Sequence, residues 1–510
     1  MTKVIKEGMP ARITPFDDSQ LHRGTDGAIH YSAIDSTLVS MLRRSRDAFP
    51  DVEAVVEVGG PRLTFREFWD RSAEVAGGLR NLGVGVGDRV ALQLPNGANW
   101  TLAFFGTIFA GAVVVPVNTR LTESETNYIL GDCGAKVVLR AGDSLPLGNP
   151  YIYENASATD LAGIFYTSGT TGFPKGAMTS HENFLSNVET ACRVVPLPKR
   201  GMRTLVSVPL FHVTGCNSQL LPALSLGGTT VVLPAFEVHS FLKSITDERI
   251  NLLTSVPAIY WLAMNQPEFA DLDLRGVEYV LYGGAPIPPE LVRRIMRAFP
   301  GARVGNGFGL SETASIATFL PHEYAESRPE TVGFAAPPVE LDLFEQDDAS
   351  DVGELLIKGP NVVKGYWNNE KATADAFVDG WLHTGDMARL DPDGFCQIVD
   401  RKKDMLNRGG ENVYCVEVEN VLAEFPGVFE VAVVGVNDPM MGEKVGAVVV
   451  PVPGVKFNPL EMLEFASSRL ANFKVPQYVI TRNEPLPRNP GGKVLKAPLR
   501  NDANWGPSLR

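Results

Sequence analysis

The sequence predicts an α/β fold: a large N-terminal body of α/β sheet subdomains, followed by a small α+β C-terminal domain. Over the first two-thirds of the chain, short apolar runs alternate with segments of helical periodicity, which is typical of parallel sheets covered by helices. The pattern changes at a charged stretch near residue 400. A chain of 510 residues that is 44% hydrophobic and 21% charged can bury a large core, so global disorder is excluded.

Two helices of the body have recognisable first turns. Thr64 and Glu67 form a capping box, in which the threonine caps the helix and the glutamate reaches back to its amide. Apolar residues then recur at helical spacing up to the stop signal Asn81-Leu82-Gly83. Thr122 and Glu125 repeat the capping box at the start of a second helix.

Short apolar runs between the helical segments predict the strands of two sheet subdomains. Strands buried on both faces are expected in parallel sheets with helices on either side. The predicted strands are Arg89–Leu94, Lys136–Leu139, Gly163–Tyr166, Thr204–Val208, Thr229–Leu233, Leu252–Ser255 and Tyr279–Tyr282.

The C-terminal residues form a separate unit in this prediction. Asp391–Gly394 is a tight turn, and the charged, apolar-poor stretch Arg401–Asp404 is typical of a linker. We therefore expect one domain over residues 1–402 and another over 403–510. In the second domain the predicted elements are strands at Val431–Val436 and Val445–Val452 and a helix capped by Asn458.

Composition narrows the class of protein. The net charge of −13 weighs against wholesale nucleic-acid binding, which needs a basic stripe, so no nucleic-acid partner is expected. Apolar runs fall short of the ~18 residues of a membrane helix, and residues 1–17 lack a signal peptide's apolar segment, so no integral membrane segment is expected. Scattered cysteines without a C-x-x-C pair argue against disulfides or a zinc cage and favour a reducing, cytoplasmic location; they are Cys133, Cys192, Cys216, Cys396 and Cys415.

The most specific local signal is the segment Tyr166–Gly176, with the sequence Tyr-Thr-Ser-Gly-Thr-Thr-Gly-Phe-Pro-Lys-Gly. Glycines let backbone amides approach closely, hydroxyls add donors, and Lys175 supplies a positive charge, which together suit a polyphosphate. It is not a Walker A loop, because Pro174 precedes the lysine and Gly176 follows it. A flexible surface turn is the alternative interpretation.

This loop resembles the signature of the adenylate-forming superfamily, which includes acyl-CoA synthetases, aryl-CoA ligases, luciferases and peptide-synthetase adenylation domains. The resemblance covers nearly the whole chain, because further motifs follow in the family's order. These are Tyr282–Pro286 (adenine site), Asn306–Thr313 (with Phe and Ser replacing the family's Tyr and Thr), Trp381–Asp386 (ribose), Asp400–Asp404 (hinge), Gly409–Asn412 (loop after the hinge) and Pro487–Lys493 (terminal motif with the mobile lysine).

The resemblance implies ATP and Mg²⁺ as reaction partners and assigns their residues. Thr167, Glu312 and Lys493 are the expected catalytic residues, with Glu312 as the Mg²⁺ ligand and Lys493 bridging the carboxylate and the α-phosphate in the transition state. Phe308 would lie against adenine, although plain core packing is an alternative for this side chain. The full expected ATP site is Thr167, Ser168, Gly169, Thr170, Thr171, Gly172, Lys175, Gly284, Ala285, Pro286, Asn306, Gly307, Phe308, Gly309, Ser311, Asp386, Arg401 and Lys493.

The family's second half-reaction implies coenzyme A and a mobile C-terminal domain. In the family this domain rotates about a hinge, withdraws the lysine and presents its opposite face to the acyl-adenylate. Lys403 occupies the hinge position, although a generic linker lysine is the alternative interpretation. Gly409, Gly410 and Glu411 would border the tunnel for the thiol arm, since glycines allow close approach of the backbone.

The segment Pro209–Cys216 resembles the family's substrate-gate motif. Amino-acid-activating members carry an aspartate there, whereas this chain has His212, and a buried pocket without an anion disfavours a cationic amine. We expect the substrate to be a medium- or long-chain fatty acid or another bulky hydrophobic acid, and an aryl, cyclic or steroid acid is the alternative. For His212, a simply packed histidine without a selective role is an equal alternative. The expected pocket residues are His212, Val213, Thr214, Cys216, Val256, Ala258 and Gly283.

Together these inferences predict an ATP-dependent acyl-CoA ligase that forms acyl-CoA, AMP and diphosphate through an acyl-adenylate. An acyl-AMP ligase that loads a carrier protein shares every ATP motif, but the insertion that such ligases carry ahead of the hinge is not evident. A luciferase-like monooxygenase shares the fold. A non-catalytic adenylate-binding protein is the alternative of another class. Relatives range from monomers to dimers, and a homodimer is expected here.

Overall fold

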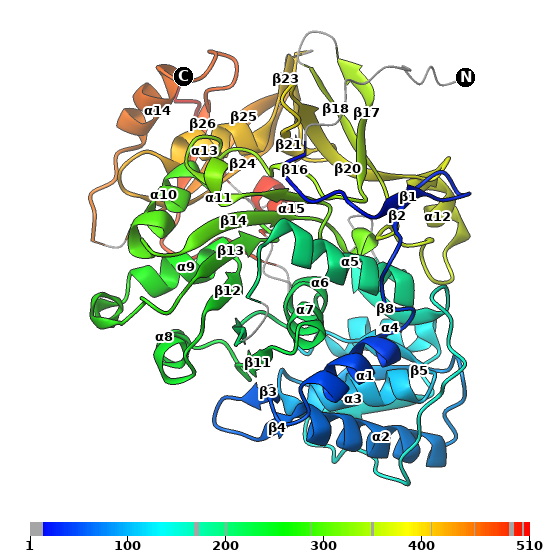
Figure 1. Cartoon of the computed structure of the whole chain (residues 1–510). Helices are drawn as coiled ribbons and strands as arrows, with labels where there is room; N and C mark the ends of the chain where they lie inside the picture. The colour runs from blue at the N-terminus through cyan, green and yellow to red at the C-terminus, as the bar shows by residue number, and fades with distance from the viewer. Residues whose placement is uncertain are drawn as a thin grey trace.

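In the described residues, two mainly parallel and two mainly antiparallel sheets form the bulk of the structure, together with a two-stranded hairpin (Figure 1). The computed structural model describes residues 14–167, 173–198, 201–285, 287–347, 351–409, 411–452, 454–488, 494–501 and 504–509. The alternation of strands and helices followed by a smaller C-terminal unit confirms the predicted α/β fold class.

The first mainly parallel sheet has the strand order β7-β5-β6-β8-β9, and its edge strand β9 runs antiparallel to β8. Helices α2 and α3 pack on one face of this sheet and α4 on the other. Both predicted capping boxes are formed, at Thr64 for α2 and at Thr122 for α4. The elements are α2 (Phe65–Asn81), β5 (Arg89–Gln93), α3 (Ala98–Phe109), β6 (Val113–Pro116), α4 (Glu123–Cys133), β7 (Val137–Arg140), β8 (Leu161–Thr167) and β9 (Lys175–Ser180).

The second mainly parallel sheet has the order β16-β15-β14-β13-β12-β10-β11-β3-β4, and its parallel strands run from β14 to β3. Helices α8, α9 and α10 cover one face, while the other face is turned to α5 and α7. Its strands are β3 (Glu53–Glu57), β4 (Arg62–Thr64), β10 (Arg203–Val206), β11 (Thr229–Val232), β12 (Leu252–Ser255), β13 (Tyr279–Gly283), β14 (Arg303–Phe308), β15 (Thr318–Leu320) and β16 (Phe334–Ala335). Its helices are α1 (Leu38–Ala48), α5 (His181–Val194), α6 (Val213–Gly215), the π-helix η1 (Cys216–Leu220), α7 (Leu221–Ser225), α8 (Val238–Asp247), α9 (Pro257–Met264), η2 (Pro267–Asp271), α10 (Pro289–Ala298), η3 (Ser311–Thr313) and α11 (His322–Ala325).

A third, antiparallel sheet adds to the two expected in the body. Apart from one short helix, the described strands of this sheet are connected by turns, so the regular helix-and-strand rhythm that signalled the first two sheets is missing in this part of the sequence. Its elements are β17 (Glu340–Asp347), β18 (Val352–Lys358), α12 (Glu370–Ala376), β19 (Phe377–Val378), β20 (Trp381–Leu390) and β21 (Cys396–Arg401). The predicted turn at Asp391–Gly394 joins β20 to β21.

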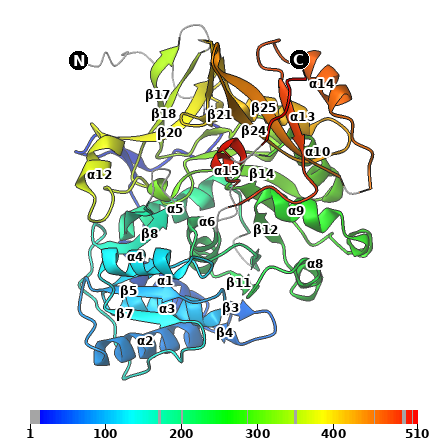
Figure 2. The same cartoon turned by 180° about the vertical axis from the view of Figure 1, so that it is seen from behind.

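The C-terminal sheet is built from strands that follow residue 405, and Figures 1 and 2 show it beside the body. The ring of Phe429 in β24 lies 4.4 Å, centroid to centroid, from Trp261 in α9, so an aromatic pair joins the two parts. The elements are β22 (Leu406–Arg408), β23 (Glu411–Val413), α13 (Cys415–Ala423), β24 (Val428–Asp438), β25 (Gly442–Pro451), α14 (Pro459–Ser467), β26 (Tyr478–Thr481) and α15 (Lys496–Asn501). Asn458 caps α14 as predicted.

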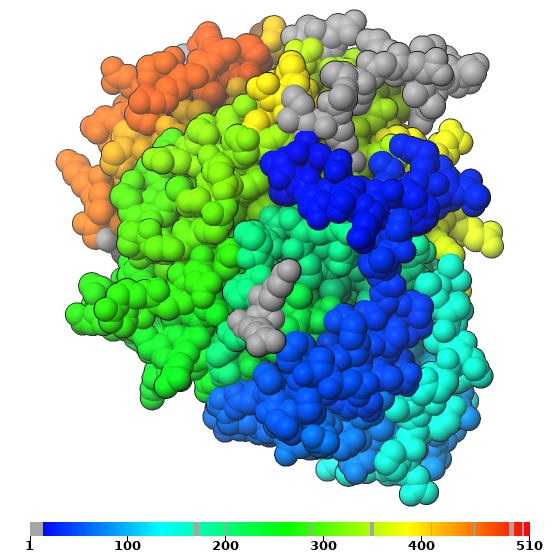
Figure 3. All heavy atoms as spheres, viewed as in Figure 1, coloured from blue at the N-terminus to red at the C-terminus, as the bar shows by residue number. Residues whose placement is uncertain are grey.

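The first described residues form a strap over the surface of the body, drawn in dark blue in Figure 3. It contains the hairpin of β1 (Leu21–Arg23) and β2 (Ile29–Tyr31). Arg23 makes a two-pronged ion pair with Glu340 of β17, and Tyr31 hydrogen-bonds Thr190 of α5. Among the described residues, none of the helices has the length and apolarity that crossing a bilayer requires.

Candidate active site

The candidate phosphate loop leaves the first sheet at the carboxyl end of β8. Thr167 is the last residue of β8 and pairs with Lys175, the first residue of β9, so both expected site residues lie at the mouth of this hairpin. The Thr167 hydroxyl donates to the Lys175 carbonyl over 3.4 Å. The other expected members of this loop, Ser168, Gly169, Thr170, Thr171 and Gly172, lie outside the described residues.

Two motifs far apart in sequence meet at the carboxyl ends of neighbouring strands. Gly283 ends β13 and pairs with Gly307 near the end of β14. A Cβ atom on Gly283 would lie 2.2 Å from the Gly307 carbonyl oxygen, so glycine is required for this contact. Gly284 has a φ of +74°, which favours glycine, and Ala285 follows it; Pro286 lies outside the described residues. The strand ends of β13 and β14 thus form one contiguous backbone surface.

The end of β14 carries the expected adenine residues Asn306 and Phe308. Asn306 is buried, and the ring of Phe308 packs against the core cluster that contains Phe319. This packing agrees with the alternative interpretation, in which Phe308 is a core residue. A Cβ atom on Gly309 would lie 1.3 Å from the Ser315 carbonyl oxygen, so this position also requires glycine.

The expected metal ligand Glu312 contacts a residue that sequence reasoning missed. The hydroxyl of Tyr366 donates to Glu312 Oε1 over 2.7 Å, and the ammonium of Lys175 lies 5.0 Å from the centroid of the same ring. Burial, together with the negative charge of Glu312, raises the pKa of Tyr366 and keeps its hydroxyl protonated as a donor. Tyr366 therefore connects the β8–β9 hairpin to the Glu312 loop.

The loop after Glu312 is strained. Ala314 and Ser315 have φ values of +50° and +127°, which non-glycine residues rarely adopt. Fully buried asparagines hold it from three segments: Asn217 Nδ2 donates to the Ala314 carbonyl (2.8 Å), Asn187 Oδ1 accepts from the Ile316 amide (2.9 Å), and Asn361 Nδ2 donates to the Thr313 (3.1 Å) and Ile316 (2.9 Å) carbonyls. Strain of this kind is maintained only where the surroundings over-determine it.

The expected ribose residues are brought together on the third sheet. Asp386 and Arg401 are directly opposite each other on β20 and β21, and Arg401 Nε lies 3.3 Å from Asp386 Oδ1. Asp386 is buried and the guanidinium is half-exposed. A buried carboxylate beside a fixed donor can accept hydrogen bonds from ligand hydroxyls.

Two of the expected acyl-pocket residues, Thr214 and Val256, lie beside the Gly283–Ala285 turn. A Cβ atom on Gly284 would lie 3.8 Å from both Thr214 Oγ1 and Val256 Cγ1, so these side chains face the turn. His212 caps α6 and its ring lies 4.8 Å from that of Phe211. Val213 and Cys216 are buried, and burial raises the pKa of the Cys216 thiol; Ala258, on the first turn of α9, is exposed.

Asn96 holds the loop that leads into this segment. Its Nδ2 donates to the Val208 carbonyl over 2.9 Å, and its Oδ1 accepts from the Leu210 amide over 2.8 Å. Asn96 also lines a cavity of about 110 Å³ at the carboxyl ends of β5 and β7, together with Glu57 and the exposed Asn99. The loop before His212 is therefore positioned by the neighbouring sheet.

The expected hinge follows directly on β21. Asp400 is buried and accepts hydrogen bonds from the amides of Arg401 and Cys415, the latter at the start of α13. Burial raises the pKa of Asp400 to about 6, although the charge of Lys496 opposes this effect. Lys403 is exposed in the turn after β21. Gly409 (φ +62°) and the exposed Glu411 flank Gly410, which lies outside the described residues, as does Lys493.

Comparison with known proteins decides the family. Residues 42–367 match the model of the AMP-binding enzyme family, and residues 417–493 match that of the AMP-binding enzyme C-terminal domain. The chain belongs to the AMP-binding enzyme family.

Relatives of this AMP-binding enzyme are ligases of coenzyme A. A feruloyl-CoA synthase of Amycolatopsis sp. is 37% identical over 90% of this chain and 97% of its own length. A long-chain-fatty-acid–CoA ligase of Mycobacterium tuberculosis is 35% identical over the same shares. The ATP-bound MatB structure from Rhodopseudomonas palustris is 30% identical, with a TM-score of 0.83 over 91% of this chain and 98% of that one. This AMP-binding enzyme is an acyl-CoA ligase: it uses ATP and coenzyme A to convert a carboxylic acid to its acyl-CoA.

The donor set of this AMP-binding enzyme fits Mg²⁺. The described residues hold no group of three or more His, Cys, Asp or Glu side chains suited to a metal ion. Mg²⁺ takes one or two carboxylates and completes its shell with water and substrate phosphates, so the single carboxylate of Glu312 fits this requirement. When bound, Mg²⁺ neutralises phosphate charge.

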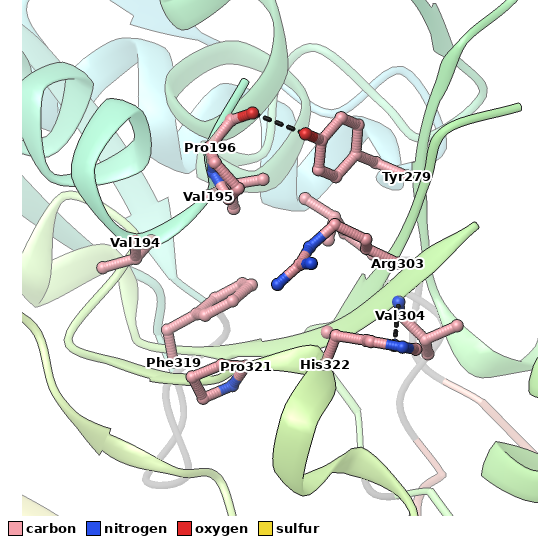
Figure 4. Close-up of a pocket in the computed structure, with 11 residues that line it drawn as sticks. Val194, Val195, Pro196, Tyr279, Arg303, Val304, Phe319, Pro321 and His322 are labelled. Atoms are coloured by element: carbon pink, nitrogen blue, oxygen red, sulfur yellow. Dashed lines mark hydrogen bonds between the residues drawn. The ribbon is translucent and has the colours of Figure 1, made fainter. Parts of the chain in front are cut away.

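A second cavity of this AMP-binding enzyme lies between the beginnings of β13 and β14 and the segments 194–196 and 319–322. It has a volume of about 20 Å³ and is shown in Figure 4. Tyr279 and Arg303, which begin β13 and β14, line it, whereas the motif residues follow the opposite ends of the same strands. The Tyr279 hydroxyl is held by the Pro196 carbonyl. Its lining includes none of the expected site residues.

Proposed function

We propose that the acid activated by this ligase is a bulky hydrophobic carboxylic acid, with fatty and aryl-substituted acids as the two candidate classes. One relative is named as a feruloyl-CoA synthase and another as a long-chain-fatty-acid–CoA ligase, and these names correspond to the aryl-substituted and the fatty class. The observation that carries the proposal is the surroundings of Gly284, where a Cβ atom would lie 3.8 Å from Thr214 and Val256 and the segment 208–217 contains no carboxylate. Such a pocket offers no counter-charge to an amino acid's ammonium group.

We further propose the residue roles for adenylation. Lys175 and the hydroxyls of the loop that it follows would bind the β- and γ-phosphates, and Glu312 would hold Mg²⁺. The backbone surface at Gly283–Ala285 and Asn306–Phe308 would accept the adenine, and Asp386 the ribose hydroxyls. The geometry that supports these roles is the convergence of hairpin mouth, strand ends and Glu312 loop.

Lys493 is proposed to stabilise the charge that develops as the acid attacks the α-phosphorus of ATP. Two anions must be brought together in this step, so the barrier is chiefly one of position and electrostatics. A mobile lysine in the C-terminal part would then have to leave before coenzyme A can reach the acyl-adenylate. A division of the chain at residues 402 and 403 is consistent with the end of β21 at Arg401 and the start of the next sheet at Leu406.

A panel of acids tests the proposed substrate. The protein would be incubated with ATP, Mg²⁺ and one acid at a time from a saturated C8–C18 series, a hydroxycinnamic series and amino acids of similar size. Diphosphate release reports adenylation, and mass spectrometry reports the thioester on coenzyme A or on a phosphopantetheinylated carrier protein. We expect acyl-CoA from fatty or aryl acids. Preferential turnover of an amino acid would overturn the proposal, and thioester on the carrier alone would overturn the choice of acceptor.

Lys493→Ala tests the catalytic role within the same assay. We expect diphosphate release to fall by about a hundredfold to a thousandfold, the range measured when one charge-stabilising group is removed from an active site. Lys456→Ala, which removes a lysine from the same domain, is the matched control. Near-normal diphosphate release by Lys493→Ala would refute the assignment.

We propose a reducing, cytoplasmic location, which the five unpaired cysteines support. A homodimer stays a prediction, to be checked by light scattering of the purified protein.

A further inference from the structure

Tyr366 occupies a position between two segments of the proposed ATP site. It lies on the stretch between β18 and α12, outside every motif that indicated the function. The residue is 7% exposed; its hydroxyl contacts Glu312 and its ring contacts Lys175, and these two residues approach it from different parts of the fold.

The backbone around Tyr366 is added to the strand that begins at Lys175. The Trp367 amide donates to the Gly176 carbonyl over 2.8 Å, and the Met178 amide donates to the Gly365 carbonyl over 3.0 Å. Tyr366 itself forms an antiparallel bridge with Ala177. These bonds fix the main chain of Tyr366 relative to β9.

Neighbouring residues also restrict the side chain of Tyr366. Phe377 packs against it edge-on with 5.6 Å between centroids, and the Tyr366 amide donates to Thr373 Oγ1 over 3.0 Å. The hydroxyl therefore has a defined direction, and it donates to Glu312 Oε1 over 2.7 Å. A hydrogen bond to a charged carboxylate from a fixed donor restricts the rotamers of that carboxylate.

Lys175 contacts the ring of Tyr366 rather than its hydroxyl. Its ammonium lies 5.0 Å from the centroid of the Tyr366 ring, within the range of a cation–π contact. One side chain thus orients an anionic group through its hydroxyl and a cationic group through its ring. The anion and the cation belong to segments that are 137 residues apart, from Lys175 to Glu312.

We infer that Tyr366 is a positioning residue that holds Glu312 and Lys175 at a fixed separation for metal-bound ATP. This inference rests on the proposed roles of those two residues in ATP binding. It assigns to Tyr366 two separable contributions: the hydroxyl acts through Glu312 on the metal-dependent part of ATP binding, and the ring acts through Lys175 on the metal-independent part.

The test is the binding of ATP to the full-length protein without any acid, measured by calorimetry once with Mg²⁺ and once with EDTA. For Tyr366→Phe, which keeps the ring, we expect the affinity in Mg²⁺ to fall about tenfold, as for loss of a hydrogen bond to a charged group, and the affinity in EDTA to stay within about twofold. For Tyr366→Leu we expect a loss in EDTA as well, because the cation–π contact is removed. Tyr324→Phe, a tyrosine outside the site, is the matched control.

A double-mutant cycle separates positioning from a general structural effect. If the hydroxyl acts through Glu312, Tyr366→Phe should have no further effect on the Mg²⁺-dependent affinity in a Glu312→Gln background. Equal losses in Mg²⁺ and EDTA, an unchanged Mg²⁺-dependent affinity in Tyr366→Phe, or full additivity with Glu312→Gln would each overturn the inference. Failure of the wild type to bind ATP would instead refute the proposed ATP site, so the two failures are distinguishable.

Discussion

The ammonium of Lys402 lies 3.1 Å from Glu354 Oε2, and this ion pair ties the residue before the predicted hinge to the body. Glu354 is 7% exposed, and its Oε1 also accepts the Gly385 amide over 3.1 Å. Burial alone would raise the pKa of Glu354, but the bond and charge of Lys402 outweigh burial and lower it. The Lys402 amide in turn donates to the Gly385 carbonyl. A rotation of the C-terminal part is therefore expected to begin after Lys402.

Lys403→Pro should impair acyl-CoA formation more than adenylation. Proline fixes φ near −65°, so it restricts the rotation that brings the second face of the domain to the acyl-adenylate. We expect diphosphate release without coenzyme A within about threefold of wild type, and acyl-CoA formation reduced by tenfold or more, or about 1.4 kcal/mol of barrier. Lys403→Ala removes the same charge but leaves the backbone free, and should resemble wild type. Equal losses in both half-reactions would contradict a hinge at this residue.

Asn217→Ala should destabilise the protein and weaken Mg²⁺-dependent ATP binding. The change leaves the buried Ala314 carbonyl without the side-chain donor that holds it, which costs about 1–3 kcal/mol. Release of the strained loop also frees the adjacent Glu312. Denaturant unfolding and calorimetry with ATP would measure the two effects. Asn265→Ala, at the exposed end of α9, is the control. If Asn217→Ala lowers stability but leaves the Mg²⁺-dependent ATP affinity unchanged, the hydrogen bond from Asn217 has a structural role only.

Asn96→Ala should alter the handling of the acid while sparing ATP. The substitution removes hydrogen bonds to the loop of Val208 and Leu210, which directly precedes His212. Loss of about 1–2 kcal/mol of positioning should raise the KM for the acid about five- to thirtyfold and leave the KM for ATP within about twofold. Asn99→Ala, which lines the same cavity, is the control. A parallel rise in both KM values would argue against this role.

Stability should fall between pH 6.5 and 4 in part because of His181. This histidine is buried and its Nδ1 accepts the Leu38 amide, so the folded protein holds it neutral. Burial lowers its pKa to about 4 from 6.5. The unfolded chain takes up a proton first as the pH falls, so the stabilisation is complete above pH 6.5 and is lost through pH 4.

A His181→Gln variant measures this contribution, because glutamine offers an acceptor but does not titrate. From pH 7 to pH 5 the free energy of unfolding of the wild type should fall by about 2 kcal/mol more than that of the variant. Denaturant titrations at the two pH values provide the comparison. Parallel losses in both proteins would mean that other groups dominate the acid response.

Local signals in the sequence predicted local structure. The capping boxes at Thr64 and Thr122 form as expected, because each depends on residues three apart. The strand predicted at Gly163–Tyr166 lies within β8, whereas β9, which pairs with it from Lys175 onward, was not predicted. The meeting of Gly283 with Gly307 follows from the parallel pairing of two adjacent strands.

Contacts across long stretches of sequence could not be predicted in this way. Tyr366 reaches Lys175 only because its backbone bridges Ala177, and nothing in the local pattern around Gly365 indicates that pairing. The buried asparagines of the Glu312 loop come from three separate segments, so their shared target is visible only in three dimensions. The antiparallel third sheet was missed because, apart from the short helix α12, turns connect its described strands, so the regular alternation of strand and helix is absent.

The addition of residues 365–367 to β9 bears on association between copies of the folded protein. β9 is the edge of its sheet, and an open edge is a template on which another chain can add a strand. The bonds of Gly365 and Trp367 occupy donors and acceptors along that edge. The segment that presents Tyr366 therefore also protects the first sheet against self-association, and substitutions that loosen it should be monitored for aggregation as well as for catalysis.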